Sequence, residues 1–145
     1  PQIIVDVGCG YGVMSCVMAD KFPNSKVIGV DTNKRARELA AKNAMRNIGQ
    51  DRIKVCAPEE VDDTLLADLI ISNPPVRIGK VAMHELIRGW TTTLNAKGQM
   101  WLVIAKNLGG DSTASYLENE LGMKVTRVAS KKGFRILKCV PGNVG

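Results

Sequence analysis

The sequence predicts an α/β fold, a doubly wound and mostly parallel sheet with an antiparallel β-hairpin at its C-terminal end. Three observations lead to this prediction. Short β-branched runs alternate with segments of helical periodicity, which is typical of parallel strands joined by right-handed crossovers. The first run ends in a glycine-rich turn, where open α/β sheets bind ligands. The last two runs flank a turn with the glycine that a hairpin needs.

Seven segments are expected to be strands, because they are short apolar runs bounded by turn residues. They span residues 3–7, 26–31, 52–56, 68–72, 99–105, 124–129 and 134–140. Pro74-Pro75 ends the fourth of these strands, and Lys131-Lys132-Gly133 forms a basic turn between the last two. The first five strands are therefore expected in a parallel sheet, to which the terminal hairpin adds one antiparallel strand.

Four segments are expected to be helices, because apolar residues recur in them every three or four positions. They span residues 11–21, 34–47, 79–94 and 112–121. The second helix is capped by Thr32 or Asn33, and the last is ended by Gly122. Strand and helix thus alternate five times before the final hairpin. His84 and Trp90 lie in the third helix and Trp101 in the fifth strand, and all three are interpreted as structural residues.

Length and composition restrict the class of protein. The chain has 145 residues, of which 45% are hydrophobic and 23% charged, as expected for one soluble globular domain over 1–145. Because an apolar strand occupies the very first residues, an N-terminal segment is expected to be missing. The longest apolar run, 100–105, is too short to span a membrane. The net charge of +6 favours an acidic partner.

The four cysteines show no Cys-x-x-Cys spacing, and His84 is the only histidine. No Cys/His cluster can therefore form, and no metal site is expected. Free thiols are typical of a reducing compartment, so a cytoplasmic location is predicted.

The first turn has the sequence Asp6-Val7-Gly8-Cys9-Gly10-Tyr11-Gly12, and Asp31 ends the second strand. Glycines let a ligand approach the backbone, and an acid about 20 residues further on can bind ribose hydroxyls. A dinucleotide-binding turn needs its third glycine where this chain has Val13, so a nicotinamide dehydrogenase is disfavoured. Asp6 suits a cationic amino group better than a pyrophosphate.

The second motif, Ser72-Asn73-Pro74-Pro75-Val76, follows the fourth strand. The prolines stiffen the turn and hold Asn73 extended at the edge of the sheet that carries the glycine turn. The Asn73 amide oxygen and the Pro74 carbonyl are two acceptors that can hold an NH2 group and stabilise positive charge on it.

These motifs resemble those of class I S-adenosylmethionine-dependent methyltransferases, which have a Rossmann-like fold. The resemblance implies S-adenosylmethionine as cofactor, with Gly8 and Gly10 beside its amino-acid part and Asp6 at its ammonium. Asp31 would bind the ribose and Ala57 would flank the adenine. The implied cofactor-binding residues are Asp6, Gly8, Cys9, Gly10, Asp31, Thr32, Ala57 and Asn73. Asn73, Pro74 and Pro75 would be catalytic.

Residues 73–80 narrow the resemblance to the small methyltransferase domain family, which includes ribosomal RNA guanine-N2 methyltransferases. The resemblance runs from Ile3 to about Val140. It implies methyl transfer to an exocyclic base amine, with guanine N2 in ribosomal RNA as the first expectation. Val76, Arg77 and Lys80 would contact the substrate. Many base and glutamine methyltransferases have an aromatic residue where this chain has Val76.

Several alternatives stay open. The acceptor could be DNA adenine, a protein glutamine or a small metabolite, and a non-catalytic module that binds cofactor or RNA is a further alternative. The distribution of charge favours RNA, since residues 1–78 hold ten basic and ten acidic residues while residues 79–145 hold ten basic and four acidic ones. We therefore expect an RNA backbone to lie against the second half. The oligomeric state is not predicted.

Overall fold

The computed structural model describes residues 2–49, 51–74, 79–106 and 109–142. It contains one sheet of seven strands in the order β3-β2-β1-β4-β5-β7-β6. The strands are β1 (Ile3–Val7), β2 (Lys26–Val30), β3 (Ile53–Cys56), β4 (Ala67–Ser72), β5 (Leu94–Ala105), β6 (Lys124–Lys131) and β7 (Phe134–Val140). The first five are parallel to one another, and β7 is antiparallel to both β5 and β6. This confirms the predicted fold class.

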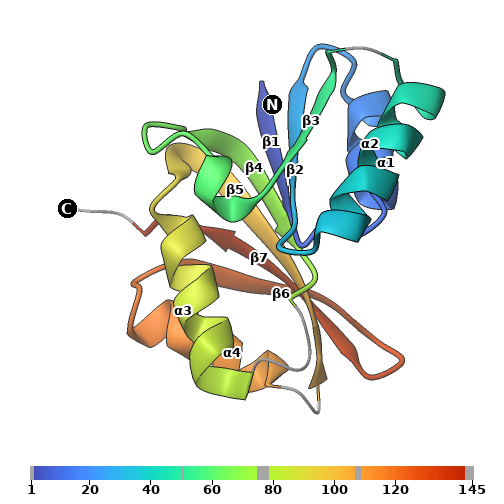
Figure 1. The fold of residues 1–145 in the computed structure, drawn as a ribbon. Coiled ribbons are helices and arrows are strands. Elements are labelled where there is room, and N and C mark those ends of the chain that lie inside the picture. The colour runs from blue at the N-terminus through green and yellow to red at the C-terminus, as the bar shows by residue number, and fades with distance from the viewer. Residues whose placement is uncertain (1, 50, 75–78, 107–108, 143–145) are drawn as a thin grey trace.

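Helices lie on both faces of the sheet (Figure 1). They are α1 (Val13–Lys21), α2 (Lys34–Asn47), α3 (Gly79–Thr91) and α4 (Gly110–Asn119). On one face α1 and α2 pack over β1, β2 and β3, and on the other face α3 and α4 pack over β5, β6 and β7. The two helix layers therefore cover opposite halves of the sheet.

The core is unequal on the two faces. The larger hydrophobic cluster lies under α3 and α4 and includes Ile70, Met100, Leu102 and Leu137, all 1% exposed or less. The smaller one, on the other face, has only Ile4, Ala19 and Val27 as buried members. The face of β4, β5 and β7 that α1 and α2 do not reach is thus the less covered part of the sheet.

Several element boundaries differ from the sequence predictions. The segment between β3 and β4 forms only a single 3-10 turn, η1 (Pro58–Glu60), so strand and helix do not alternate five times. Helix α3 ends at Thr91 rather than residue 94, because the hydroxyls of Thr91, Thr92 and Thr93 donate to carbonyls three residues earlier. Leu94, expected on the helix, starts β5 instead. The predicted N-cap is confirmed at Asn33, whose side chain accepts from Ala36 N.

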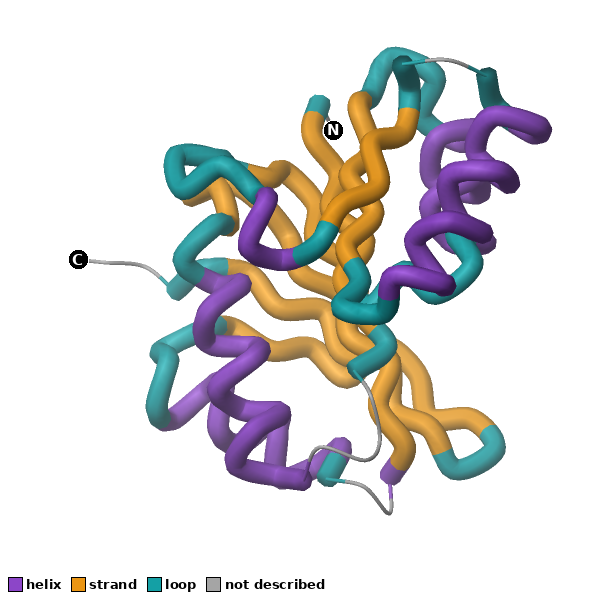
Figure 2. The backbone as a smooth tube through the Cα atoms, in the orientation of Figure 1, coloured by secondary structure: helices purple, strands orange, loops and turns teal. Residues whose placement is uncertain are grey.

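The turns that follow β1 and β2 lie at the same edge of the sheet (Figure 2). The carboxyl ends of β1, β2 and β3 lie at this edge, and each of these strands is followed by a loop. Within the described ranges, no helix is long and apolar enough to cross a membrane.

Candidate active site

The glycine turn after β1 is held by the backbone of the neighbouring strand. The N–H groups of Gly8 and Cys9 both donate to the Val30 carbonyl, at 2.8 and 2.9 Å. Gly10 has φ +55°, and a Cβ built on it would meet nothing within 4 Å. The backbone at Gly10 therefore faces open space that a ligand can enter.

The carboxylate of Asp31 links the glycine turn to the end of β2. Its Oδ2 accepts from Gly10 N at 2.9 Å and its Oδ1 from Asn33 N at 2.8 Å. The Asp31 N–H donates to the Cys56 carbonyl, next to the buried Ala57. The structure thus brings Gly10, Asp31 and Ala57 to one edge, as the sequence predicts.

Asp6 is a buried carboxylate on β1, 5% exposed, and it lines a cavity below the glycine turn. Its Oδ2 accepts a hydrogen bond of 2.7 Å from Ser15 Oγ on α1. Burial raises the pKa of Asp6, since the charged form loses water, and the Ser15 hydrogen bond opposes that rise. A cationic group that entered the cavity would stabilise the Asp6 carboxylate.

Asn73 lies beside the glycine turn at the end of β4. A Cβ built on Gly8 would lie 3.8 Å from the Asn73 main-chain oxygen, and the Ser72 hydroxyl donates to the Val7 carbonyl at 3.1 Å. Pro74 is buried whereas Asn73 is exposed. The proline thus anchors the turn, and the asparagine beside it stays accessible to solvent.

A cavity of about 850 Å³ extends from the carboxyl edge over the less covered face of the sheet, and Gly10, Asp31 and Ala57 are not part of its lining. Asp6, Gly8, Cys9 and Asn73 line it at the carboxyl edge. Its apolar lining comes from α1 and from the sheet, and includes Met14, Met18, Phe22, Leu69, Ile71, Trp101, Val103 and Ile136. The cavity is large enough for a ligand of cofactor size.

The residues at this edge fit S-adenosylmethionine. A buried carboxylate suits its ammonium, an acid at the end of the second strand suits its ribose hydroxyls, and a glycine turn without side chains allows close approach. Asp6, Asp31 and Gly10 would supply these contacts. Among the described residues, no group of three or more His, Cys, Asp or Glu is placed to hold a metal ion.

Other predicted site residues have less defined places. Thr32 is exposed between Asp31 and the N-cap of α2, and Lys80 is exposed in the first turn of α3. Pro75, Val76 and Arg77 lie outside the described residues. Trp101, interpreted as core, lies instead on the cavity wall, where its Nε1 donates to Gln99 Oε1.

Cys9 lines the cavity, but its thiol has low reactivity. Burial raises its pKa to about 12, and the nearby carboxylates of Asp6 and Asp31 add to that rise. The thiol therefore stays protonated at neutral pH and does not act as a nucleophile.

Ser15 is a polar residue of the site that the sequence pattern does not reveal. It falls nine residues after Asp6, and nothing in the helical pattern distinguishes it from a serine that packs in the core. Its contact with Asp6 depends on how α1 crosses β1, which a linear pattern does not show.

Comparison with known proteins gives consistent matches. The sequence profile described as "Methyltransferase small domain" matches residues 1–138. The uncharacterized protein YbxB of Bacillus subtilis is 37% identical over 138 residues, which are 93% of this chain and 68% of YbxB.

Two further relatives carry functional descriptions. The ribosomal protein L11 methyltransferase of Vibrio vulnificus is 29% identical over 83% of this chain and 39% of its own length. The tRNA1(Val) (adenine(37)-N6)-methyltransferase of Porphyromonas gingivalis is 34% identical over 58% of this chain and 35% of its own length. The chain therefore spans well under half of these two relatives.

Solved structures show the same fold. A methyltransferase from Pyrococcus furiosus superposes with a TM-score of 0.78 at 23% identity, covering 98% of this chain and 76% of that one. Magnesium protoporphyrin IX methyltransferase from Synechocystis, solved with bound SAH, gives 0.79 at 16% identity, covering 97% and 74%.

Proposed function

Because this chain belongs to the methyltransferase small domain family and is an S-adenosylmethionine-dependent methyltransferase, we propose that its acceptor is an exocyclic base amine in RNA, namely guanine N2 of ribosomal RNA. The observation that carries the proposal is the position of Asn73, which is exposed, precedes the buried Pro74 and has its main-chain oxygen next to Gly8. An amide at this place can meet an acceptor amine next to the bound cofactor.

The chemistry follows from the acceptors at the turn. The cofactor supplies a methyl group activated by a positively charged sulfur. The Asn73 amide oxygen and the Pro74 carbonyl would each accept a hydrogen bond from one N–H group of the amine. These two hydrogen bonds would point the nitrogen lone pair at the methyl carbon. Transfer would form an N–C bond and break the S–C bond of the cofactor, and the Asn73 and Pro74 oxygens would stabilise the positive charge that the nitrogen gains. The alkylated nitrogen then loses a proton to water.

RNA as the acceptor is supported by charge placed at the same edge of the sheet. Phe134 at the start of β7 pairs with Ala105 at the carboxyl end of β5, so the β6–β7 hairpin tip extends from that edge (Figure 1). The tip carries Lys131 and Lys132, both exposed. A flipped or unpaired base could then enter the site while the hairpin holds the backbone.

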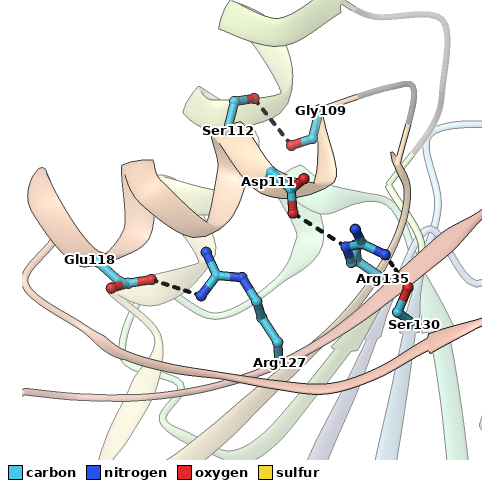
Figure 3. Close-up of polar contacts among 7 residues, drawn as sticks. All are labelled: Gly109, Asp111, Ser112, Glu118, Arg127, Ser130 and Arg135. Atoms are coloured by element: carbon cyan, nitrogen blue, oxygen red, sulfur yellow. Dashed lines mark hydrogen bonds and ion pairs between the residues drawn. The ribbon is translucent and has the colours of Figure 1, made fainter.

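The arginines of the hairpin have another role. Arg127 pairs with Glu118 at 3.5 Å and Arg135 with Asp111 at 3.2 Å, so both are tied to α4 (Figure 3). Arg135 also donates to Ser130. These contacts brace the hairpin against the helix, and the two lysines at its tip keep their charges for a partner.

Ribosomal protein as the acceptor is the competing candidate, because one relative is named as a ribosomal protein L11 methyltransferase. A second relative is named as a tRNA adenine-N6 methyltransferase, which supports a base amine. The two candidates differ in the substrate that becomes labelled.

Transfer of a labelled methyl group separates them. Unmodified ribosomal RNA, transfer RNA and ribosomal proteins are each incubated with the protein and labelled cofactor, and products are identified by nucleoside and peptide mass spectrometry. We expect N2-methylguanosine in ribosomal RNA. Label in protein alone, or in transfer RNA alone, would contradict the proposal.

The role of Asn73 has its own variant test. Asn73→Ala is expected to abolish transfer while its affinity for S-adenosylhomocysteine stays close to that of the unmodified protein. Asn47→Ala is the matched control, since that amide donates to the Asn43 carbonyl within α2 and, among the described residues, to no other group. Unchanged turnover in Asn73→Ala would remove the assigned role.

A further inference from the structure

The hydroxyl of Ser15 is the one side-chain donor that Asp6 has among the described residues. The two side chains are almost fully buried, at 1% and 5% exposure, and their oxygens lie 2.7 Å apart. A serine inside a helix commonly bonds to a carbonyl of its own helix. Ser15 instead reaches across to β1, to the carboxylate that lines the cavity.

Gly29 on β2 makes room for this contact. A Cβ built on Gly29 would lie 3.1 Å from Ser15 Oγ and 3.2 Å from Cys9 Sγ. Any larger residue at position 29 would therefore push the hydroxyl, the thiol or both. Residues of β1, α1 and β2 make up this arrangement. The Ser15 hydroxyl lies between Gly29 on β2 and the buried Asp6 on β1.

The hydrogen bond affects Asp6 in two ways. It fixes one carboxylate oxygen, Oδ2, and so sets the rotation of the group that lines the cavity. It also favours the charged form, and lowers the pKa of Asp6 against the rise that burial causes. A hydrogen bond from the Ser15 backbone also lowers the pKa of Asp6, and the charge of Asp31 raises it.

We propose that Ser15 is a positioning residue for the cofactor, which holds the Asp6 carboxylate in the orientation that receives the cofactor's ammonium group. The inference rests on the assignment of S-adenosylmethionine to this site and is independent of the identity of the acceptor. It predicts that Ser15 contributes to affinity for the amino-acid part of the cofactor and not for its adenosine part.

Two ligands separate these parts. S-adenosylhomocysteine has the amino-acid portion, whereas 5′-methylthioadenosine keeps the adenosine and the thioether but lacks the ammonium. Calorimetry on the unmodified protein and on Ser15→Ala measures both affinities without any acceptor. We expect Ser15→Ala to weaken S-adenosylhomocysteine binding about tenfold, since hydrogen bonds to charged groups are among the stronger ones, and to leave methylthioadenosine within about twofold.

The pH profile gives a readout that a merely structural serine would not move. Protonation of Asp6 removes the partner of the ammonium, so affinity for S-adenosylhomocysteine should fall as pH is lowered through the Asp6 pKa. The titratable groups next to Asp6 are the Asp31 carboxylate, whose charge raises the pKa of Asp6, and the Cys9 thiol, whose own pKa is raised to about 12. Ser15→Ala should shift the fall to higher pH.

Two further variants complete the test. Asp6→Asn should weaken S-adenosylhomocysteine and remove the acidic fall, and Ser15→Ala should have no further effect in that background. Gly29→Ala disturbs the same hydroxyl without replacing it, and should reproduce the selective loss even where Ser15→Ala does not fold. Equal weakening of both ligands, no weakening of either, or an undiminished Ser15 effect beside Asp6→Asn would overturn the proposal. Loss of RNA methylation with these binding results intact would overturn only the acceptor.

Discussion

Gly12 and Gly10 both have positive φ, and replacing each with alanine should separate packing from ligand access. Gly12 is the N-cap of α1 with φ +87°, and its Cβ would lie 3.1 Å from Ala40 Cβ and 3.2 Å from Ala40 Cα. Because Ala40 is 1% exposed inside α2, the helix itself would have to move. At Gly10, with φ +55°, the new methyl would meet nothing within 4 Å.

The two substitutions are expected to differ in unfolding free energy only because the Gly12 substitution creates a close contact with Ala40. A left-handed alanine costs about 1–2 kcal/mol, of which loss of unfolded-state freedom returns about 0.4–1 kcal/mol. Crowding against Ala40 adds about 1–3 kcal/mol for Gly12→Ala only. We therefore expect Gly12→Ala to lower the unfolding free energy by about 2–4 kcal/mol, and Gly10→Ala by about 1 kcal/mol.

Urea unfolding measures these differences, and calorimetry with S-adenosylhomocysteine measures binding. Gly10→Ala should remain folded and lose cofactor affinity, since its methyl occupies the open space at the turn. Gly12→Ala should lose more unfolding free energy than Gly10→Ala. Equal destabilisation by the two substitutions, or normal cofactor affinity in Gly10→Ala, would refute this reasoning.

Three other predictions concern charge and thiols. Burial raises the folded-state pKa of Asp6 above its unfolded value, so the charged acid lowers the stability of the folded protein at neutral pH. Asp6→Asn should therefore raise the melting temperature of the ligand-free protein at pH 7. Calorimetric scans should show this gain becoming smaller as the pH falls through the folded-state pKa. Replacing Lys131 and Lys132 with alanine should reduce the steepness of log affinity against log salt for single-stranded RNA by about 1.4, because two phosphate contacts are lost. Fluorescence anisotropy measures this slope. An unchanged slope would show that the hairpin does not contact RNA. Cys9 and Cys139, whose buried thiols have pKa values raised to about 12, should resist a thiol reagent at pH 8 until the chain unfolds.

Local patterns were sufficient for most of the fold because burial and turns leave traces in consecutive residues. Isoleucine and valine runs marked β1 and β4, and Asn33 was recognisable as a cap because its side chain competes for a free N–H. The same logic failed at residue 94, where apolar spacing suited both a helix and a strand. Three successive threonines ended the helix there through their own hydroxyls.

By itself the sequence determined the parallel sheet, the glycine turn, the acid at the end of the second strand and the asparagine before two prolines. Each is a property of neighbouring residues, and parallel topology brings the carboxyl ends of the strands to one edge. Tertiary structure alone decided that Ser15 meets Asp6 and that Trp101 faces a cavity rather than the core. These contacts join residues on different elements, and they depend on how α1 crosses the sheet and on which half of each face the helices cover.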